Sequence, residues 1–325
     1  MLTLFRTNQT AYGLLLLLYA LLLRGAYFLH GYPADAANDG IFSEVTKWLL
    51  GENYILTGVV TVLIVFLQSL LINNLCNRYR LFKEVTLFPG LFYVLFVSAV
   101  QDFLPLSSVL LGNTFLILAI DNLFSIFKTD KCADAIFNVG WWIGLAALFY
   151  NAFIFFFLLA IVGLMVLRNF RFKEVLMMSS GYALPFIFTT AYYFWQDELV
   201  NFWQEQVVNQ FGFIDFHLED NGYLNYKLGL LGILFLMGFF NQYTFEKSYR
   251  TRSFIYVFYT TLTISGLTFL FQDNIQVSHF LIIAVPLSIL LTARFLKFKK
   301  TTAELIHILL FVGIILIQFQ IFPRL

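Results

Sequence analysis

The chain has 325 residues, of which 60% are hydrophobic, 19% aromatic and only 12% charged, with a formal net charge of +1. Soluble domains carry about 25% charged residues, so this composition excludes an ordinary soluble globular protein. It also excludes a disordered chain and a nucleic-acid-binding protein, because both need far more charge. The two cysteines provide neither a disulfide framework nor a metal knuckle.

Apolar segments long enough to cross a bilayer follow one another along the chain. A hydrocarbon core about 30 Å thick needs roughly 20 apolar residues in a helix. The stretch 133–167 is too long for one span, because as a single helix it would measure about 50 Å. We expect it to form two spans that turn near Tyr150 and Asn151. The sequence thus predicts an all-α, polytopic transmembrane helical bundle of about 11 spans. The other spans are expected at 11–30, 54–75, 85–104, 107–127, 174–196, 228–245, 254–271, 279–296 and 303–322.

Basic residues gather in alternate loops, which predicts the orientation. One side holds only Lys47, Lys227, Arg324 and, near a helix end, Arg24. By the positive-inside rule the other, basic side faces the cytoplasm, so the N-terminus is expected inside and the C-terminus outside a bacterial inner membrane. We expect one integral membrane domain over residues 1–325. The basic side carries Arg6, Arg78, Arg80, Lys83, Lys128, Lys131, Arg168, Arg171, Lys173, Lys247, Arg250, Arg252, Lys297, Lys299 and Lys300.

Two outer loops are longer than the other connections. In the loop 31–53, apolar residues from Ile41 to Leu49 recur at helical spacing, and polar residues fill the opposite face. In the loop 196–226, residues from Leu199 to Phe211 repeat this pattern. We expect short helices along the outer membrane surface, where they either roof a cavity or serve only as packing.

Acidic residues at the expected outer face form a candidate catalytic set, namely Asp39, Asp102 and Asp35. Asp35 and Asp39 follow the first span and would share one helical face, while Asp102 ends the third span. A carboxylate there can act as a general base towards a hydroxyl, or coordinate a divalent cation, Mg²⁺ or Mn²⁺, that bridges a phosphate. The alternatives are that Asp39 caps a helix, Asp35 is a solvated loop acid, and Asp102 caps the next span near Ser107.

Residues near the same face are candidates for binding a phosphate. Arg24 lies in the outer third of the first span, where a guanidinium is costly unless it is paired, and its planar fork suits phosphate oxygens. Tyr27 and His30 follow on the same segment, and His279 opens the tenth span. The alternative for Arg24 is that its side chain snorkels to the interface, and for His279 that it fills space there.

The segment NDGIFSEVTKWLLGENYI, with Asp39 near its start, resembles the first outer loop of the GT-C superfamily. These multi-pass glycosyltransferases use lipid-phosphate-linked sugars, and they carry an acidic residue and short juxtamembrane helices in this loop. The long loop 196–226 and the late segment HFLIIAVPLSILLTARF are also similar to theirs. Asn38 and Asp39 stand where members have an adjacent acidic pair.

The resemblance implies a GT-C-like fold and an inner-membrane transferase that moves a sugar from a polyprenyl-phosphate carrier to an acceptor on the extracytoplasmic side. Its partners would be membrane lipid and the lipid-linked sugar. Two alternatives stay open, namely a non-enzymatic subunit or scaffold of an envelope complex, with membrane-protein partners, and a transporter for a lipid or small anion. The lack of a visible internal repeat argues mildly against the transporter.

Overall fold

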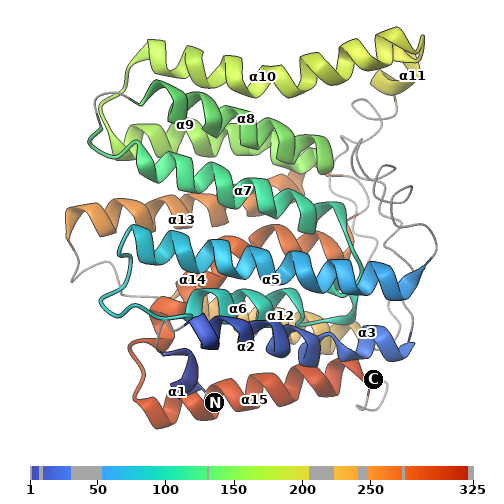
Figure 1. Ribbon diagram of the computed structural model, residues 1–325, viewed down its shortest axis with the longest axis vertical. Helices are drawn as coiled ribbons and strands as arrows, with labels where there is room; N and C mark the ends of the chain where they lie inside the picture. The colour runs from blue at the N-terminus through green and yellow to red at the C-terminus, as the bar shows by residue number, and fades with distance from the viewer. Residues whose placement is uncertain are drawn as a thin grey trace.

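Long helices lie side by side and cross the molecule in alternating directions, with α10 and α15 at opposite edges of the view (Figure 1). The computed structural model describes residues 2–6, 10–30, 53–129, 132–204, 223–240, 248–272 and 275–320, and no β-strand occurs in these ranges. The α-helices are α1 Leu2–Phe5, α2 Thr10–Leu23, α3 Gly25–His30, α5 Tyr54–Arg78, α6 Phe88–Val97, α7 Ser108–Ser125, α8 Ala133–Phe149, α9 Phe156–Leu167, α10 Phe172–Trp195, α11 Leu199–Trp203, α12 Leu224–Phe239, α13 Tyr249–Thr268, α14 Ala284–Phe295 and α15 Lys300–Gln318. The 3₁₀ helices are η1 Gln101–Phe103, η2 Asn151–Phe155, η5 Phe269–Phe271 and η6 Val277–Ile283.

The described helices fall into two length classes. Six are long and apolar enough to cross a membrane: α5, α7, α10, α13 with η5, η6 with α14, and α15. Shorter apolar helices are α2, α6, α8, η2 with α9, and α12. Each predicted apolar segment therefore contains a helix, and the described part of the chain is all-helical, with six helices that could span a membrane.

The stretch 133–167 forms a hairpin, as its length predicts. Helix α8 ends at Phe149, Tyr150 has extended backbone angles, and η2 begins at Asn151. The far ends of the two arms meet, because Arg168 Nη1 donates to the carbonyl oxygen of Thr129 at 3.2 Å and also contacts Cys132 Sγ. A single helix would hold these ends about 50 Å apart.

The predicted basic loops meet at one end of the bundle, which we call the basic end. Arg6 forms an ion pair with Glu84 at 2.7 Å, and Arg78 forms one with Asp121 at 3.0 Å. Their loops lie on the same side of the view as the start of α13, whereas α3 and α11 lie on the other side, which we call the polar end (Figure 1). The loops that carry these basic residues therefore gather at one end of the bundle (Figure 1).

Helix α6 lies inside the bundle and is shorter than predicted. All of its residues are buried, and it packs between α5 and α14. The backbone amide of its Gly90 donates to Asn73 Oδ1 at 2.8 Å, and a Cβ at this glycine would lie 2.6 Å from the carbonyl of Ser69. Ten helical residues reach about 15 Å, so the α-helix covers only half of the segment 85–104 that was predicted to form a span. The helix ends at Val97, and the buried chain continues through η1 to Ser107.

Glycines allow α8 and α10 to approach closely. A Cβ added at Gly140 would meet the backbone carbonyl of Met178, and one added at Gly144 would lie 2.6 Å from the carbonyl of Tyr182. A Cβ at Gly181 would in turn meet the carbonyl of Phe137. This is the small-residue contact by which membrane helices associate, because lipid offers them no hydrophobic driving force.

Candidate functional site

Arg24 stabilises the irregular segment that follows the end of α6 at Val97, and we call this interruption of the helix the break. Its guanidinium donates from Nη1 to the carbonyl of Val97 at 3.0 Å, and from Nη2 to the carbonyls of Phe103, at 2.9 Å, and Leu104. Its side chain is buried, with 1% of the residue exposed. Irregular backbone survives at membrane depth only where protein groups satisfy it, and Arg24 supplies those groups here. Snorkelling is therefore wrong for this residue, and its contact with a phosphate stays a prediction.

Two other predicted phosphate-binding residues follow Arg24 on α3. Tyr27 is buried and forms a small cluster with Ala26 and Leu104, so it lies against the same break. His30 Nδ1 donates to the carbonyl of Ala26 at 3.1 Å, and its ring lies 5.8 Å from that of Phe319. The structure thus brings Tyr27 close to the segment held by Arg24, and it places His30 against the end of α15.

Asp102 forms an ion pair inside the bundle. Its Oδ2 lies 2.7 Å from Lys227 Nζ, and the two side chains are 33% and 5% exposed, respectively. The alternative that Asp102 caps α7 is wrong, because Ser107 caps this helix by accepting from the amide of Leu110 at 3.2 Å. A buried lysine is costly unless it is paired, so this contact with Asp102 is what makes the burial of Lys227 tolerable.

Glutamines fasten α15 to the same segment. Gln318 Nε2 donates to the carbonyl of Ser98, and Gln101 Nε2 donates to the carbonyl of Gln318. Gln320 Nε2 then donates to Gln101 Oε1 at 2.9 Å, and Tyr223, which precedes α12, donates to the carbonyl of Gln320 at 3.3 Å. We call these five residues the glutamine latch. The latch ties α15, η1 and the start of α12 into one polar cluster around Asp102.

His279 belongs to the second irregular segment, η6, which packs against η1. The residue is buried, and its Nδ1 accepts from the backbone amide of Gln276 at 3.2 Å, which places the ring proton on Nε2. Its ring lies 5.5 Å from that of Tyr150, at the tip of the α8–α9 hairpin. Gln272 Nε2 donates to the hydroxyl of Tyr150, and Asn113 Nδ2 donates to the carbonyl of Leu281 at 2.9 Å. His279 is thus an element of a capped, buried turn rather than a surface filler.

An apolar groove lies along the helix that carries Lys227. It lies between α12 and α13, has a volume of about 630 Å³, and is lined from Leu228, the residue after Lys227, to Phe239. Those α12 residues span about 16 Å of helix, which is half of a hydrocarbon core. The remaining lining side chains are almost all apolar, including Leu262 and Phe280. The groove has the dimensions and chemistry to hold part of a lipid chain.

The remaining candidates lie outside the described residues. These are Asp35 and Asp39, together with the amphipathic pattern of the loop 31–53 and most of the loop 196–226. Within the described ranges no group of three His, Cys, Asp or Glu side chains could hold a metal ion, so the structure assigns no ligand set for Mg²⁺ or Mn²⁺. In the second loop, residues 196–204 and 223–226 are described; they include the short helix α11, whose Phe202 stacks on Tyr193 with ring centroids 4.4 Å apart.

The sequence did not identify two parts of this site. Lys227 was visible only as one of the few basic residues on the outer side, because nothing near it in sequence marks Asp102 as its partner. The glutamine latch was missed altogether, although three glutamines in otherwise apolar helix ends are a detectable signal, since a buried amide must find a hydrogen-bond partner.

Comparison with known proteins gives one family match. Residues 49–325 match the model of a family described as "Family of unknown function (DUF6427)". No curated protein matches the chain.

Proposed function

The chain belongs to the family DUF6427, and we propose that it is a membrane transferase that moves a sugar from a polyprenyl-phosphate carrier to an acceptor outside the inner membrane. The observation that carries the proposal is the apolar groove between α12 and α13, whose first lining residue on α12, Leu228, directly follows Lys227 of the Asp102–Lys227 ion pair. A lipid-linked phosphate needs the same arrangement, with room for a chain in the bilayer and charged groups at its headgroup.

The proposed topology has eleven passes, made by the six long and five shorter apolar helices. The basic end then faces the cytoplasm by the positive-inside rule. This orientation would place the polar end, with Asp102, Lys227 and the groove mouth, at the outer face. The loop that carries Asp35 and Asp39 would open on the same side, because Asn53 begins α5 there.

In the proposed reaction, the acceptor hydroxyl oxygen forms a bond to the anomeric carbon of the sugar. The bond from that carbon to the phosphate oxygen breaks, and the polyprenyl phosphate leaves with the electron pair. Asp39 takes the hydroxyl proton, and Asp102 and Asp35 orient the acceptor. Lys227, which precedes the first lining residue of the groove, would stabilise the leaving phosphate, whereas Arg24 keeps the backbone after α6 in place. A phosphate that attracts Lys227 would also release Asp102 towards the acceptor.

Binding of the carrier is the direct test. The full-length protein in nanodiscs is titrated with undecaprenyl phosphate, and bound lipid is measured by native mass spectrometry. Sugar transfer is then measured with radiolabelled polyprenyl-phosphate hexoses and membrane acceptors. We expect Asp39→Asn to abolish transfer while carrier binding persists, and Lys227→Met to weaken binding. Asp197→Asn is the matched control, because it is the same change on an exposed acid at the same end.

Unchanged transfer by Asp39→Asn would overturn the catalytic assignment. The groove would not be a carrier site if Lys227→Met still bound the carrier and the wild type bound a neutral polyprenol equally well. If no sugar is transferred and a membrane protein co-purifies in fixed ratio, the chain is a non-enzymatic subunit instead.

One observation favours a transporter as the second candidate. Two irregular segments, η1 after α6 and η6 before α14, pack against each other inside the bundle. Transporters place paired broken helices at their substrate sites. Proteoliposomes loaded with undecaprenyl phosphate separate the two candidates, since a transporter moves the lipid between leaflets without an acceptor, and a transferase does not.

A further inference from the structure

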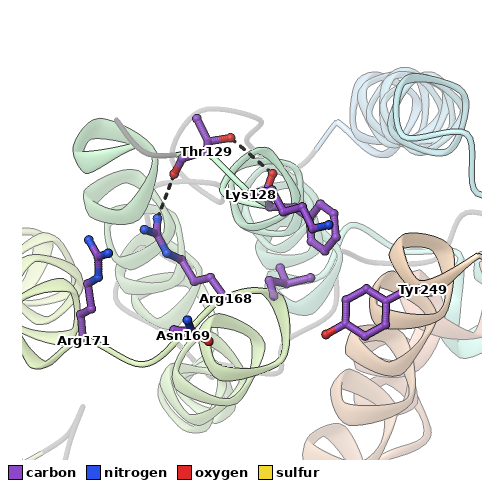
Figure 2. A pocket seen from close by; sticks show the side chains of 8 residues that line it. Lys128, Thr129, Arg168, Asn169, Arg171 and Tyr249 are labelled. Atoms are coloured by element: carbon purple, nitrogen blue, oxygen red, sulfur yellow. Dashed lines mark hydrogen bonds between the residues drawn. The ribbon is translucent and has the colours of Figure 1, made fainter.

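A second cavity lies at the basic end, away from the site described above. It has a volume of about 400 Å³ and is formed where three connections meet: the end of α7, the α9–α10 turn and the start of α13. Figure 2 shows Lys128, Arg168, Asn169, Arg171 and Tyr249 arranged around it. The lining therefore combines cationic, amide and hydroxyl donors, which is the set that an anionic group requires.

Arg168 builds the wall of this cavity, and its charge is already balanced. Its Nη2 lies 3.1 Å from Glu174 Oε1, and both side chains are nearly buried. Its Nη1 donates to the carbonyl of Thr129, as the dashed line in Figure 2 marks. These contacts join the α9–α10 turn to the end of α7, so the pocket has a fixed frame.

Lys128 and Arg171 supply positive charge that no described acid balances. Both are exposed, and neither forms an ion pair with another residue in the described ranges. Lys128 has a φ of 55°, in the left-handed region, where a lysine is less stable than a glycine. Arg250 adds a further cation nearby, with its guanidinium 5.9 Å from the ring centre of Phe127.

The surroundings of the cavity are those of a membrane interface. Phe170, Phe172 and Tyr249 are exposed large aromatic residues next to it. Aromatic side chains gather at the level of the lipid headgroups, where their rings contact the acyl region and polar atoms reach water. The cavity therefore opens where phospholipid headgroups lie.

We propose that this pocket binds the phosphate of an anionic phospholipid headgroup. Lys128 and Arg171 bind the phosphate charge, and the Asn169 amide and Tyr249 hydroxyl donate to headgroup oxygens. Basic pockets between membrane helices on the cytoplasmic side recognise such lipids, since two cations near the surface attract an anionic headgroup in a salt-dependent way. The proposal does not depend on the transferase reaction at the polar end.

The experiment measures lipid retention by the full-length protein. The detergent-purified protein is titrated with phosphatidylglycerol and, separately, with phosphatidylcholine, and bound lipids are counted by native mass spectrometry. We expect the wild type to prefer phosphatidylglycerol, and Lys128→Gln/Arg171→Gln to lose that preference by on the order of tenfold. The control, Arg80→Gln/Lys83→Gln, removes two exposed charges from another loop at the same end and should keep the preference.

Two further measurements make the result decisive. Tyr249→Phe removes one exposed hydroxyl and should weaken phosphatidylglycerol binding by roughly threefold without unfolding the protein. Inorganic phosphate is added as a competitor to distinguish a lipid from a soluble anion. Displacement of the lipid by submillimolar phosphate, equal binding of the two phospholipids, or equal loss in the control variant would each overturn the proposal.

Discussion

Replacing Arg24 with methionine tests whether its guanidinium maintains the break after α6. Methionine retains a long apolar side chain but offers no hydrogen-bond donor. The carbonyls of Val97, Phe103 and Leu104 would then remain inside the bundle without the donors that Arg24 provides. We expect this variant to be inserted normally, and to be less stable than the wild type.

The size of the effect follows from the opposing terms. A hydrogen bond from a charged donor contributes about 1.5–3 kcal/mol, so the bonds to the three carbonyls contribute on the order of 6 kcal/mol. Burying a guanidinium costs several kcal/mol, which methionine avoids. We therefore expect a net loss of about 3 kcal/mol in the free energy of unfolding. The stability of Arg24→Lys should lie between those of the wild type and Arg24→Met, because one ammonium cannot reach carbonyls on both sides of the break.

The native cysteines provide the assay. Cys76 and Cys132 are both buried, so a thiol-reactive fluorescent dye reports thermal unfolding. We expect the midpoint to fall by about 5 °C for Arg24→Met. The matched control is Arg78→Met, because that guanidinium is 57% exposed in its pair with Asp121. Such a surface pair contributes below about 1 kcal/mol, so its loss should shift the midpoint by only about 1–2 °C.

Amide hydrogen exchange locates the effect. The amides of Phe103 and Leu104 donate to the carbonyls of Val100 and Gln101. In Arg24→Met these amides should exchange faster, whereas those of α8 should not change. Equal midpoints for Arg24→Met and Arg78→Met, or unchanged exchange at Phe103, would refute the role of Arg24 as a backbone clamp.

Three further outcomes are expected. Gly140→Ala should lower the free energy of unfolding, measured by chemical denaturation, by about 1–3 kcal/mol, because its Cβ would meet the α10 backbone. Gly313→Ala should be neutral or slightly stabilising, because a Cβ at Gly313 would have open space. A hydrogen bond from Arg6 lowers the pKa of Glu84 below its ordinary value of 4.5. The stabilisation from this pair is therefore complete above about pH 4.5 and is lost as the pH falls through the folded-state pKa. Because Glu84 is half-exposed, Glu84→Gln should remove less than about 1 kcal/mol of the stability that the wild type loses below about pH 4.5, as measured by chemical denaturation. Asp102→Asn should destabilise the protein by about 3 kcal/mol, because it leaves the buried Lys227 unpaired. The double variant Asp102→Asn/Lys227→Met should be destabilised by less, and a double-mutant cycle measured by chemical denaturation tests this difference.

Helix existence and the pairing of loops followed from local properties of the sequence. The turn at Tyr150 was predictable because 133–167 exceeds one bilayer thickness. The meeting of loops that carry Arg168 and Lys128 was predictable because insertion sorts basic residues to one side. Both depend on length and charge, which are readable without knowing any tertiary contact.

The break after α6 could not be predicted in the same way. Four of the seven residues from Ser98 to Leu104 are still apolar, so hydropathy alone does not place the end of the helix at Val97. The break persists because Arg24 and Gln318, both far away in sequence, satisfy its carbonyls. The candidate site was predicted only in part for the same reason: Asp102 and Lys227 were visible as charges, whereas their pairing arises from the packing of η1 against α12.

The glutamine latch makes the assembly of this protein dependent on the order of its synthesis. Gln318 follows its partner Ser98 by 220 residues. At about 5–20 residues per second, Gln318 is synthesised roughly 10–40 s after Ser98. Throughout that interval the carbonyl of Ser98 must be hydrogen-bonded to groups other than its native partner. The native hydrogen bond at Ser98 therefore forms only after α15 has been synthesised.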